Sequence, residues 1–302
     1  MPRWSDEDAR ALAELRATIG DRLGSVPQFP EVVGDRKLLR FLRGHDYSVP
    51  KAAALFCQFL DWRRELRVDE IRESIVRGGM NHPTKFPNGE KILSLIPQVV
   101  LAHEVTDYFG CALVVEQFTF SPSVVLKEIS LDEYLKFVIY CLEYRSIVLE
   151  QLSEEAERKK FSSIQASHSS EPYGTILYAC VIRDLRGVGW DHVGSTGREI
   201  LGAVIKVASD NYPELMRRCF IINSPFIFYT AWIFIQGLLA AKTVGKIMVL
   251  GADYLEHLLK EVHVDSLPHF LGGKDHIGHI PFNFDSADNG LLSMTSHSTL
   301  SE

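Results

Sequence analysis

The amino-acid sequence predicts an α/β fold, in which a small N-terminal helical bundle packs on a domain with a mostly parallel sheet. Three observations lead to this prediction. Residues 5–75 are polar and amphipathic with helical periodicity, short apolar runs alternate with helical segments from about Lys91 onward, and residues 219–241 carry no charge. Strands that alternate with helices are typical of a parallel sheet whose faces are covered by helices.

The N-terminal bundle is predicted from two amphipathic helices. The first opens at Gly34 or Asp35 and turns its leucines and Phe41 inward and its arginines outward. The second begins at Ser48-Val49-Pro50, with the serine as N-cap and the proline in the first turn. We place this bundle at residues 1–80.

The second domain is predicted from short apolar runs and longer periodic segments over residues 81–283. The expected strands are 92–96, 111–115, 175–182, 218–223 and 246–250, and the expected helices are 132–160, 195–209 and 254–262. A serine-rich loop at 162–170 is expected to end the first of these helices. Residues 284–302 are rich in Ser, Asn and Thr, and this composition predicts a flexible tail.

The uncharged segment, residues 219–241, also indicates where the protein could meet lipid. Asn223-Ser224-Pro225 divides it into a short strand and a helix of about four turns, which is too short to cross a bilayer. At helical period this helix has no continuous polar face, so protein, lipid or both must cover it. It is therefore either the deepest core element or a surface that meets lipid.

Composition excludes some classes of function. The chain has 302 residues, of which 46% are hydrophobic, and a net charge of −7, which argues against general nucleic-acid binding. Its five cysteines are scattered in apolar contexts, as expected for buried free thiols in a reducing compartment. Because the N-terminus also lacks a hydrophobic signal segment, we expect a cytoplasmic protein.

Motifs for catalysis are weak. Gly187-Val188-Gly189 lies where a dinucleotide fingerprint would lie, but His192 replaces the third glycine, and a tight turn explains the motif better. His276 and His279 have no neighbouring ligands at metal spacing. We therefore predict no catalytic residue, no metal site and no enzyme.

An ordered set of motifs resembles the CRAL-TRIO lipid-binding family over residues 35–275. The matching segments are Lys37-Leu38-Leu39-Arg40-Phe41-Leu42-Arg43, Arg183-Asp184-Leu185-Arg186-Gly187, Asn211-Tyr212-Pro213-Glu214, Ile221-Ile222-Asn223-Ser224-Pro225-Phe226, Thr243-Val244-Gly245-Lys246-Ile247 and Leu267-Pro268 followed by Gly272-Gly273. Within the family, the chain is most similar to the phosphatidylinositol/phosphatidylcholine transfer proteins. The resemblance implies an N-terminal helical module on a lipid-binding domain, with the sheet as floor of a hollow apolar pocket.

The resemblance also implies that the uncharged helix is a mobile gate over this pocket. One side of it would face acyl chains, and the open gate would lie in a membrane interface. The residues implied for the pocket and the gate are Ala179, Val181, Phe226, Phe228, Ala231, Trp232, Ile235 and Leu239.

The family's inositol-phosphate site corresponds here to Glu214, Thr243 and Lys246. A lysine pairs with a phosphate, and a carboxylate accepts hydrogen bonds from hydroxyl groups. Two departures from the family pattern occur. His45-Asp46 replaces a basic pair, so that His45 would contribute a cation only when protonated. Ala179 and Val181 replace hydroxyl residues that bind the phosphate of phosphatidylcholine, and they offer no donor.

These observations predict a protein that extracts one lipid and exchanges it between membranes. Phosphatidylinositol is the favoured lipid and phosphatidylcholine is disfavoured. The other expected partners are the membrane surface, transiently, and a lipid kinase, whereas nucleic acid is not expected and the chain is expected to be a monomer. Two alternatives remain: a carrier or sensor of a neutral ligand such as a sterol or a tocopherol-like molecule, and an enzyme that acts on lipid. No cofactor other than the bound lipid is expected.

Overall fold

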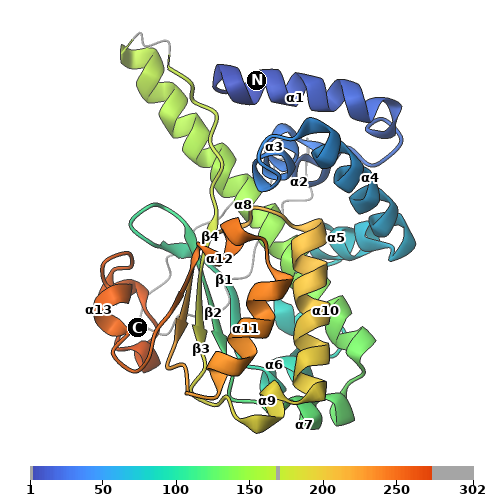
Figure 1. Ribbon diagram of the computed structural model, residues 1–302. Helices are drawn as coiled ribbons and strands as arrows, with labels where there is room; N and C mark the ends of the chain where they lie inside the picture. Colours follow the sequence, from blue (N-terminus) through green and yellow to red (C-terminus); the bar gives the residue numbers. More distant parts are fainter. Residues whose placement is uncertain (1–2, 168–170, 274–302) are drawn as a thin grey trace.

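The computed structural model describes residues 3–167 and 171–273 of the chain. Figure 1 shows a sheet with helices on both faces, and a long helix, α8, that projects beyond it and carries the N-terminal helices along its far half. The predicted tail at 284–302 lies outside the described residues.

The sheet has five strands in the order β1-β2-β3-β4-β5. They are β1 (Gln98–Thr106), β2 (Ala112–Gln117), β3 (Ala179–Asp184), β4 (Met216–Ile222) and β5 (Ile247–Val249). Strands β1 and β2 are antiparallel, and the other three pairings are parallel. The predicted α/β fold with a mostly parallel sheet is therefore confirmed.

Six helices precede the sheet or flank its first strand. They are α1 (Asp6–Ile19), α2 (Pro30–Val33), α3 (Asp35–Gly44), α4 (Val49–Glu65), α5 (Val68–Val76) and α6 (Gly89–Leu95). Ser5 caps α1 by accepting the backbone N–H of Asp8, and acidic residues fill the first turn of that helix, where the helix dipole favours them. The proline of α4 stands in its first turn, as predicted.

The described residues after β2 form seven further helices. They are α7 (Pro122–Glu128), α8 (Leu131–Ser167), α9 (Trp190–Val193), α10 (Ser195–Asn211), α11 (Phe228–Leu238), α12 (Ala241–Val244) and α13 (Leu255–Leu258). Short 3₁₀ turns cover Gly20–Arg22, Pro83–Lys85, Val264–Ser266 and His269–Leu271.

Side chains of the sheet alternate between two cores because successive residues of a strand point to opposite faces. Ala112, Val114, Ala179, Val181, Cys219 and Ile221 join one core, which also contains residues of α8, α10 and α11. Leu113, Val115, Cys180, Ile182, Phe220 and Ile222 join the core on the opposite face, with Leu258, Val262, Leu267 and Leu271. The face that carries Val181 is called the helix face below.

The N-terminal helices have a core of their own, which includes Leu38, Phe41, Phe56 and Phe59. However, Ile75 of α5 belongs to the core of the helix face. The division of the chain into domains at residue 80 stays a prediction.

Three of the four basic residues of α3 are buried, which contradicts the prediction that its arginines point outward; only Arg43 stays partly exposed. Arg36, Lys37 and Arg40 are each less than 8% exposed. Arg36 pairs with Glu150 at 2.5 Å and with Glu157 at 2.6 Å. Both carboxylates lie on α8, more than a hundred positions away in sequence, so no local pattern could indicate the pairs.

Arg63 of α4 repeats this arrangement. It donates two hydrogen bonds to Glu143 of α8, at 2.8 and 3.0 Å, and Tyr212 donates a third to the same carboxylate at 2.7 Å. We call Arg36, Lys37, Arg40 and Arg63, with Glu143, Glu150 and Glu157, the ionic interface.

Several predicted elements differ from those in the structure. Residues 92–95 belong to helix α6 and not to a strand, and Ile96 follows as its C-cap; Ile92 and Ile96 are buried four positions apart, which is a helical spacing. The unpredicted β1 follows it. Helix α8 continues to Ser167 through most of the expected serine-rich loop, and α13 covers only four residues of the expected helix 254–262.

The strand expected at 175–182 begins only at Ala179. Side chains of the N-terminal half bind the backbone before it. Arg36 donates to the carbonyl of Thr175, Arg40 donates to that of Leu177, and the N–H of Leu177 donates to Ser153. These bonds replace the ladder that a longer strand would make.

Candidate functional site

Helix α11 is apolar on both its inner and its outer side. Phe228 and Ile235 point inward and are 6% and 8% exposed. Ala231, Trp232 and Leu239 are half-buried and pack against the same core. The residues predicted to lie on the inner side of the gate helix therefore do face the sheet, with the exception of Phe226.

Phe226, which was assigned to the pocket with these residues, is 89% exposed and lies in the turn before α11. Ile233 is 75% exposed and Tyr229 is 55% exposed, so the outer side of the helix presents large apolar groups to solvent. Figure 1 shows α11 on the helix face, beside α10. Within the described residues, no helix combines the length and the apolar character that a membrane crossing requires.

Ala179 and Val181 form the floor opposite α11. They are 1% and 3% exposed and belong to the same core as Phe228 and Ile235. Neither side chain can donate a hydrogen bond. The floor is therefore apolar at these two positions.

The predicted headgroup residues Glu214 and Lys246 meet at the amino-terminal end of the parallel strands. The ammonium of Lys246 lies 2.7 Å from Oε2 of Glu214 and donates to the carbonyl of Met216 at 3.1 Å. Thr243 is half-buried in α12, and its carbonyl accepts the N–H of Lys246 at 3.0 Å. The structure thus brings all three residues together.

Lys242 belongs to this group, although sequence reasoning missed it. Its ammonium lies 3.5 Å from Oε1 of Glu214 and donates to the carbonyl of Arg43 at 2.5 Å. Its position directly before Thr243 could have identified Lys242 from the sequence. Two lysines therefore face one carboxylate, so an oxyanion would find a local excess of positive charge there.

Glu214 is held in an unusual backbone conformation. Its φ is +56°, in the left-handed region that residues other than glycine rarely adopt. Arg40 of α3 donates a hydrogen bond to its carbonyl, and a Cβ on Gly44 would lie 3.1 Å from Pro213. The N-terminal bundle therefore fixes the turn that carries Glu214.

His45 ends α3 close to this site. Burial and the nearby Lys51 lower its pKa, and the carboxylates of Asp46 and Glu214 oppose this only in part. Its side chain is therefore neutral at pH 7, so Lys242, and not His45, supplies the additional cation.

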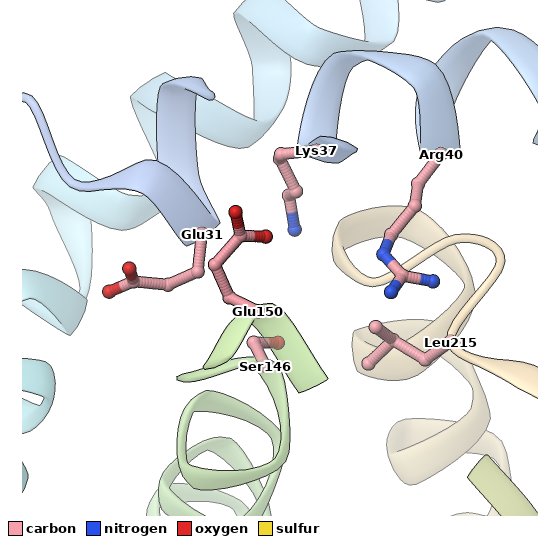
Figure 2. A pocket seen from close by; sticks show the side chains of 6 residues that line it. All are labelled: Glu31, Lys37, Arg40, Ser146, Glu150 and Leu215. Carbon is pink, nitrogen blue, oxygen red and sulfur yellow. The ribbon is translucent and has the colours of Figure 1, made fainter. Parts of the chain in front are cut away.

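Two cavities lie away from α11. A cleft of about 370 Å³ lies between α3 and α8, lined by polar groups that include Arg36 and Glu154. A second cavity has a volume of about 10 Å³. Figure 2 shows its lining, in which Lys37 of α3 points toward Glu150 of α8 and Arg40 points toward Leu215. This cavity has room for about one water molecule. No residue of α11 lines either cavity.

Beneath α11, the helix face has an incomplete cover of apolar side chains. Many apolar side chains that pack on its core keep part of their surface accessible, among them Leu201, Val204, Ile205, Trp232, Ile247 and Val249. The centre of the same core is closed, since Val114, Phe137 and Cys219 are 0% exposed, so the accessible side chains form its rim. An apolar layer that is loosely covered can separate from its floor at a lower cost than a close-packed one.

The ionic interface differs from this apolar layer because it buries charged groups, of which Lys37 is one. Its ammonium donates to the carbonyl of Asn211 at 3.0 Å and lies 4.2 Å from the ring centre of Phe59. Burial lowers its pKa to about 7, although Glu143 acts in the opposite direction. The charge of this lysine is therefore poorly compensated.

No group of three or more His, Cys, Asp or Glu side chains in the described residues could hold a metal ion. All five cysteines are free, and four are buried.

Comparisons with known proteins identify relatives of the whole arrangement. Residues 113–273 match the family model of the CRAL/TRIO domain. The Sec14 cytosolic factor of Schizosaccharomyces pombe is 30% identical over 246 residues, which are 81% of this chain and 76% of that protein. The phosphatidylinositol/phosphatidylcholine transfer protein SFH12 of Arabidopsis thaliana is 29% identical over 273 residues, which are 88% of this chain and 45% of that protein. The chain thus spans less than half the length of this plant relative.

A solved structure also resembles the chain. The crystal structure of Sfh5 superimposes with a TM-score of 0.60 and 16% identity, over 92% of this chain and 91% of that chain. At this identity, the likeness concerns the fold.

Proposed function

Because this chain belongs to the CRAL/TRIO domain family, we propose that it binds a phospholipid beneath α11 and transfers it between membranes. The names of its relatives support this proposal, since they refer to transfer of phosphatidylinositol and phosphatidylcholine. The observation that carries it is α11 itself, an apolar helix with a sheet on one side and solvent on the other.

The transfer cycle follows from the two sides of α11. The outer residues Phe226, Tyr229 and Ile233 enter the interface of a bilayer, where their exposed apolar surface is removed from water. Docking then draws α11 away from the sheet, and the lipid enters over Val181 and Ala179. Closure returns Phe228 and Ile235 to the core, with acyl chains between the helix and the floor.

Headgroup selection occurs at the amino-terminal end of the parallel strands. Lys246 and Lys242 bind the phosphate of phosphatidylinositol, and Glu214 accepts hydrogen bonds from the inositol hydroxyls. Thr243 adds a hydroxyl donor. The apolar pair Ala179 and Val181 leaves the phosphate of phosphatidylcholine without a donor on the floor, so phosphatidylinositol is the favoured lipid.

The same apolar floor favours a second candidate function. A neutral ligand such as a sterol would bury its whole surface over Ala179 and Val181 without needing Lys246. The protein would then be a carrier of that ligand, and again no covalent chemistry would occur. Action from the cytosol is part of both proposals and is supported by the name of the S. pombe relative. The monomeric state and the lipid kinase partner stay predictions from the sequence.

The test compares two lysines that each pair with a carboxylate at 2.7 Å. Lys246 pairs with Glu214 at the proposed headgroup site, and Lys206 pairs with Asp210 on the exposed side of α10. We expect Lys246→Ala to lower the rate of phosphatidylinositol transfer between vesicles about tenfold or more, because a charged hydrogen bond to phosphate is lost. Lys206→Ala should transfer as the wild type does.

Circular dichroism and urea unfolding control for the fold of both variants. Equal transfer by Lys246→Ala and the wild type would remove the headgroup role. A wild-type protein that transfers a labelled sterol but not phosphatidylinositol would favour the neutral-ligand function instead.

A further inference from the structure

Helix α3 binds both ends of the turn that carries Glu214. Residues 211–214 end α10 and lead into β4. The ammonium of Lys37 donates to the carbonyl of Asn211 at 3.0 Å, and Arg40 donates to the carbonyl of Glu214. Each pair joins residues that are 174 positions apart in the chain. The conformation of this turn therefore depends on the N-terminal helices.

Arg40 connects the two segments that enter the central parallel strands. One of its nitrogens donates to the carbonyl of Glu214 before β4, and another donates to the carbonyl of Leu177 before β3, at 2.6 Å. The side chain is buried, and its guanidinium carbon lies 5.2 Å from the ring centre of Tyr178. A planar guanidinium holds two carbonyls in a fixed geometry, which a single ammonium does less well. Arg40 therefore determines where Glu214 lies relative to the sheet.

The charge of Arg40 is buried in an unusual way. Among the described residues, no carboxylate forms an ion pair with it, whereas Arg36 of the same helix pairs with Glu150 and Glu157. Burial lowers the pKa of Arg40 to about 10, so the side chain is still charged at pH 7. A buried charge destabilises a fold unless polar groups compensate it. The groups that compensate Arg40 are two carbonyls, and one of them belongs to Glu214.

The end of α3 contacts the same turn with its backbone. A Cβ on Gly44 would lie 3.1 Å from Cβ of Pro213 and 3.5 Å from Cγ of Glu214, and the first distance is shorter than an ordinary van der Waals contact. The carbonyl of Arg43 accepts a hydrogen bond from Lys242, which lies 3.5 Å from the carboxylate of Glu214. Two residues of the proposed headgroup site are thus held by α3.

We propose that Arg40 is a positioning residue for headgroup selection, and that Gly44 assists it by leaving room for Pro213. This inference rests on the proposed function, because Glu214 selects a lipid only if its site binds a headgroup. A hydrogen bond depends steeply on distance and angle, so a displaced Glu214 would bind the inositol hydroxyls less well. Selection then depends on a helix that lies outside residues 113–273, the range of the family model.

The experiment measures how the protein chooses between two lipids that differ only in the headgroup. Vesicles contain equal amounts of phosphatidylinositol and diacylglycerol with the same acyl chains, and native mass spectrometry after gel filtration gives the ratio of the two complexes. We expect Arg40→Met to lower the ratio of phosphatidylinositol to diacylglycerol about tenfold, because the hydrogen bonds of Glu214 weaken. A loss of stability alone would lower both complexes and leave the ratio unchanged.

Arg36→Met is the matched control. Arg36 is similarly buried on α3, but it binds Glu150, Glu157 and the carbonyl of Thr175, all of which lie outside residues 211–214. We expect this variant to lose stability in urea unfolding, because it leaves buried carboxylates without their cation. Its lipid ratio should stay that of the wild type.

Gly44→Ala disturbs the turn without removing a charge. Alanine is favourable in a helix, so the variant should fold, and its Cβ should displace Pro213 by a few tenths of an ångström. We expect the lipid ratio to fall about threefold. In Gly24→Ala, the new Cβ would meet only an oxygen of Asp21 at 3.6 Å, and the ratio should not change. This pair of variants decides the question if Arg40→Met does not fold.

An unchanged ratio in folded Arg40→Met would overturn the inference, as would an equal fall of the ratio in Arg36→Met. A preference of the wild type for phosphatidylinositol that is lost in Lys246→Ala but kept in Arg40→Met and Gly44→Ala would contradict this inference alone. A wild-type protein that carries neither lipid would contradict the proposed function, and the inference would fall with it.

Discussion

The ionic interface buries charged side chains, whereas helix α11 exposes large apolar ones, and both arrangements are unusual. In the ionic interface, four cationic side chains are less than 8% exposed. In α11 and the turn before it, Phe226, Tyr229 and Ile233 are more than half exposed. Charged residues are rarely buried, and a cluster of exposed large apolar residues usually marks a site of interaction.

The difference between the two regions lies in where the partner is. Arg36 and Arg63 have carboxylates of α8 as fixed partners, so their burial joins the N-terminal helices permanently to α8. The outer side of α11 has no comparable cover among the described residues. The first region is thus closed by partners within the chain, whereas the second leaves apolar surface exposed, as the proposed membrane contact requires.

We expect the largest effect on stability in the ionic interface, where the adjacent residues Arg63 and Arg64 can be compared. Arg63→Met leaves the buried carboxylate of Glu143 without its cation, and we expect it to lower the free energy of unfolding by about 3–5 kcal/mol. Arg64 is 77% exposed and pairs with Asp61 on the surface. Arg64→Met should cost less than about 1 kcal/mol. Urea unfolding of both variants measures the difference, and equal losses would contradict the distinction between them.

The next effect compares two isoleucines of α11 that differ in exposure. Ile235 is 8% exposed, and we expect Ile235→Ala to cost about 2–4 kcal/mol of stability because it opens a cavity in the core. Ile233 is 75% exposed, and Ile233→Ala should change stability by less than about 0.5 kcal/mol.

In vesicle sedimentation, we expect Ile233→Ala to lose more affinity for vesicles than Ile235→Ala does. Ile233→Ala removes apolar surface that enters the bilayer in the proposed cycle, so we expect its affinity for vesicles to fall about tenfold. A variant at position 233 that sediments with vesicles as the wild type does would show that this side of α11 is not the membrane contact.

The smallest effect is a pH dependence that belongs to Lys37. Its pKa is lowered from 10.5 to about 7 in the folded protein, so between these values the unfolded chain binds more protons than the folded chain. Stability therefore rises with pH in this window, and the full cost of the buried charge is present below pH 7.

We expect the unfolding free energy of the wild type to rise relative to that of Lys37→Met by about 2 kcal/mol between pH 7.5 and 9. Urea unfolding of both proteins at several pH values gives this difference, in which the titration of other groups cancels. Parallel curves for the two proteins would mean that Lys37 stays charged in the fold.

The sequence was sufficient for features that local patterns encode. Alternation of apolar runs and helical segments predicted the α/β sheet, and the break at Asn223-Ser224-Pro225 separated β4 from α11 correctly. The ordered motifs predicted the family. Glu214, Thr243 and Lys246 lie together in the structure, and their role at a headgroup stays a prediction.

Other features depend on partners that are distant in sequence. The arginines of α3 were expected outside because their partners, such as Glu150, lie on α8. The strand expected from residue 175 was shortened by side chains of the N-terminal half. Residues 92–95, expected as part of a strand, lie in helix α6, because a short apolar run fits either structure and only tertiary packing decides between them.

The proposed function requires the helix face beneath α11 to hold one phospholipid. Native mass spectrometry of the purified protein, after incubation with phosphatidylinositol vesicles and gel filtration, tests it most directly. We predict a species heavier than the free chain by the mass of one phosphatidylinositol, at reduced abundance in Lys246→Ala. A wild-type protein that emerges at the mass of the chain alone would contradict the account.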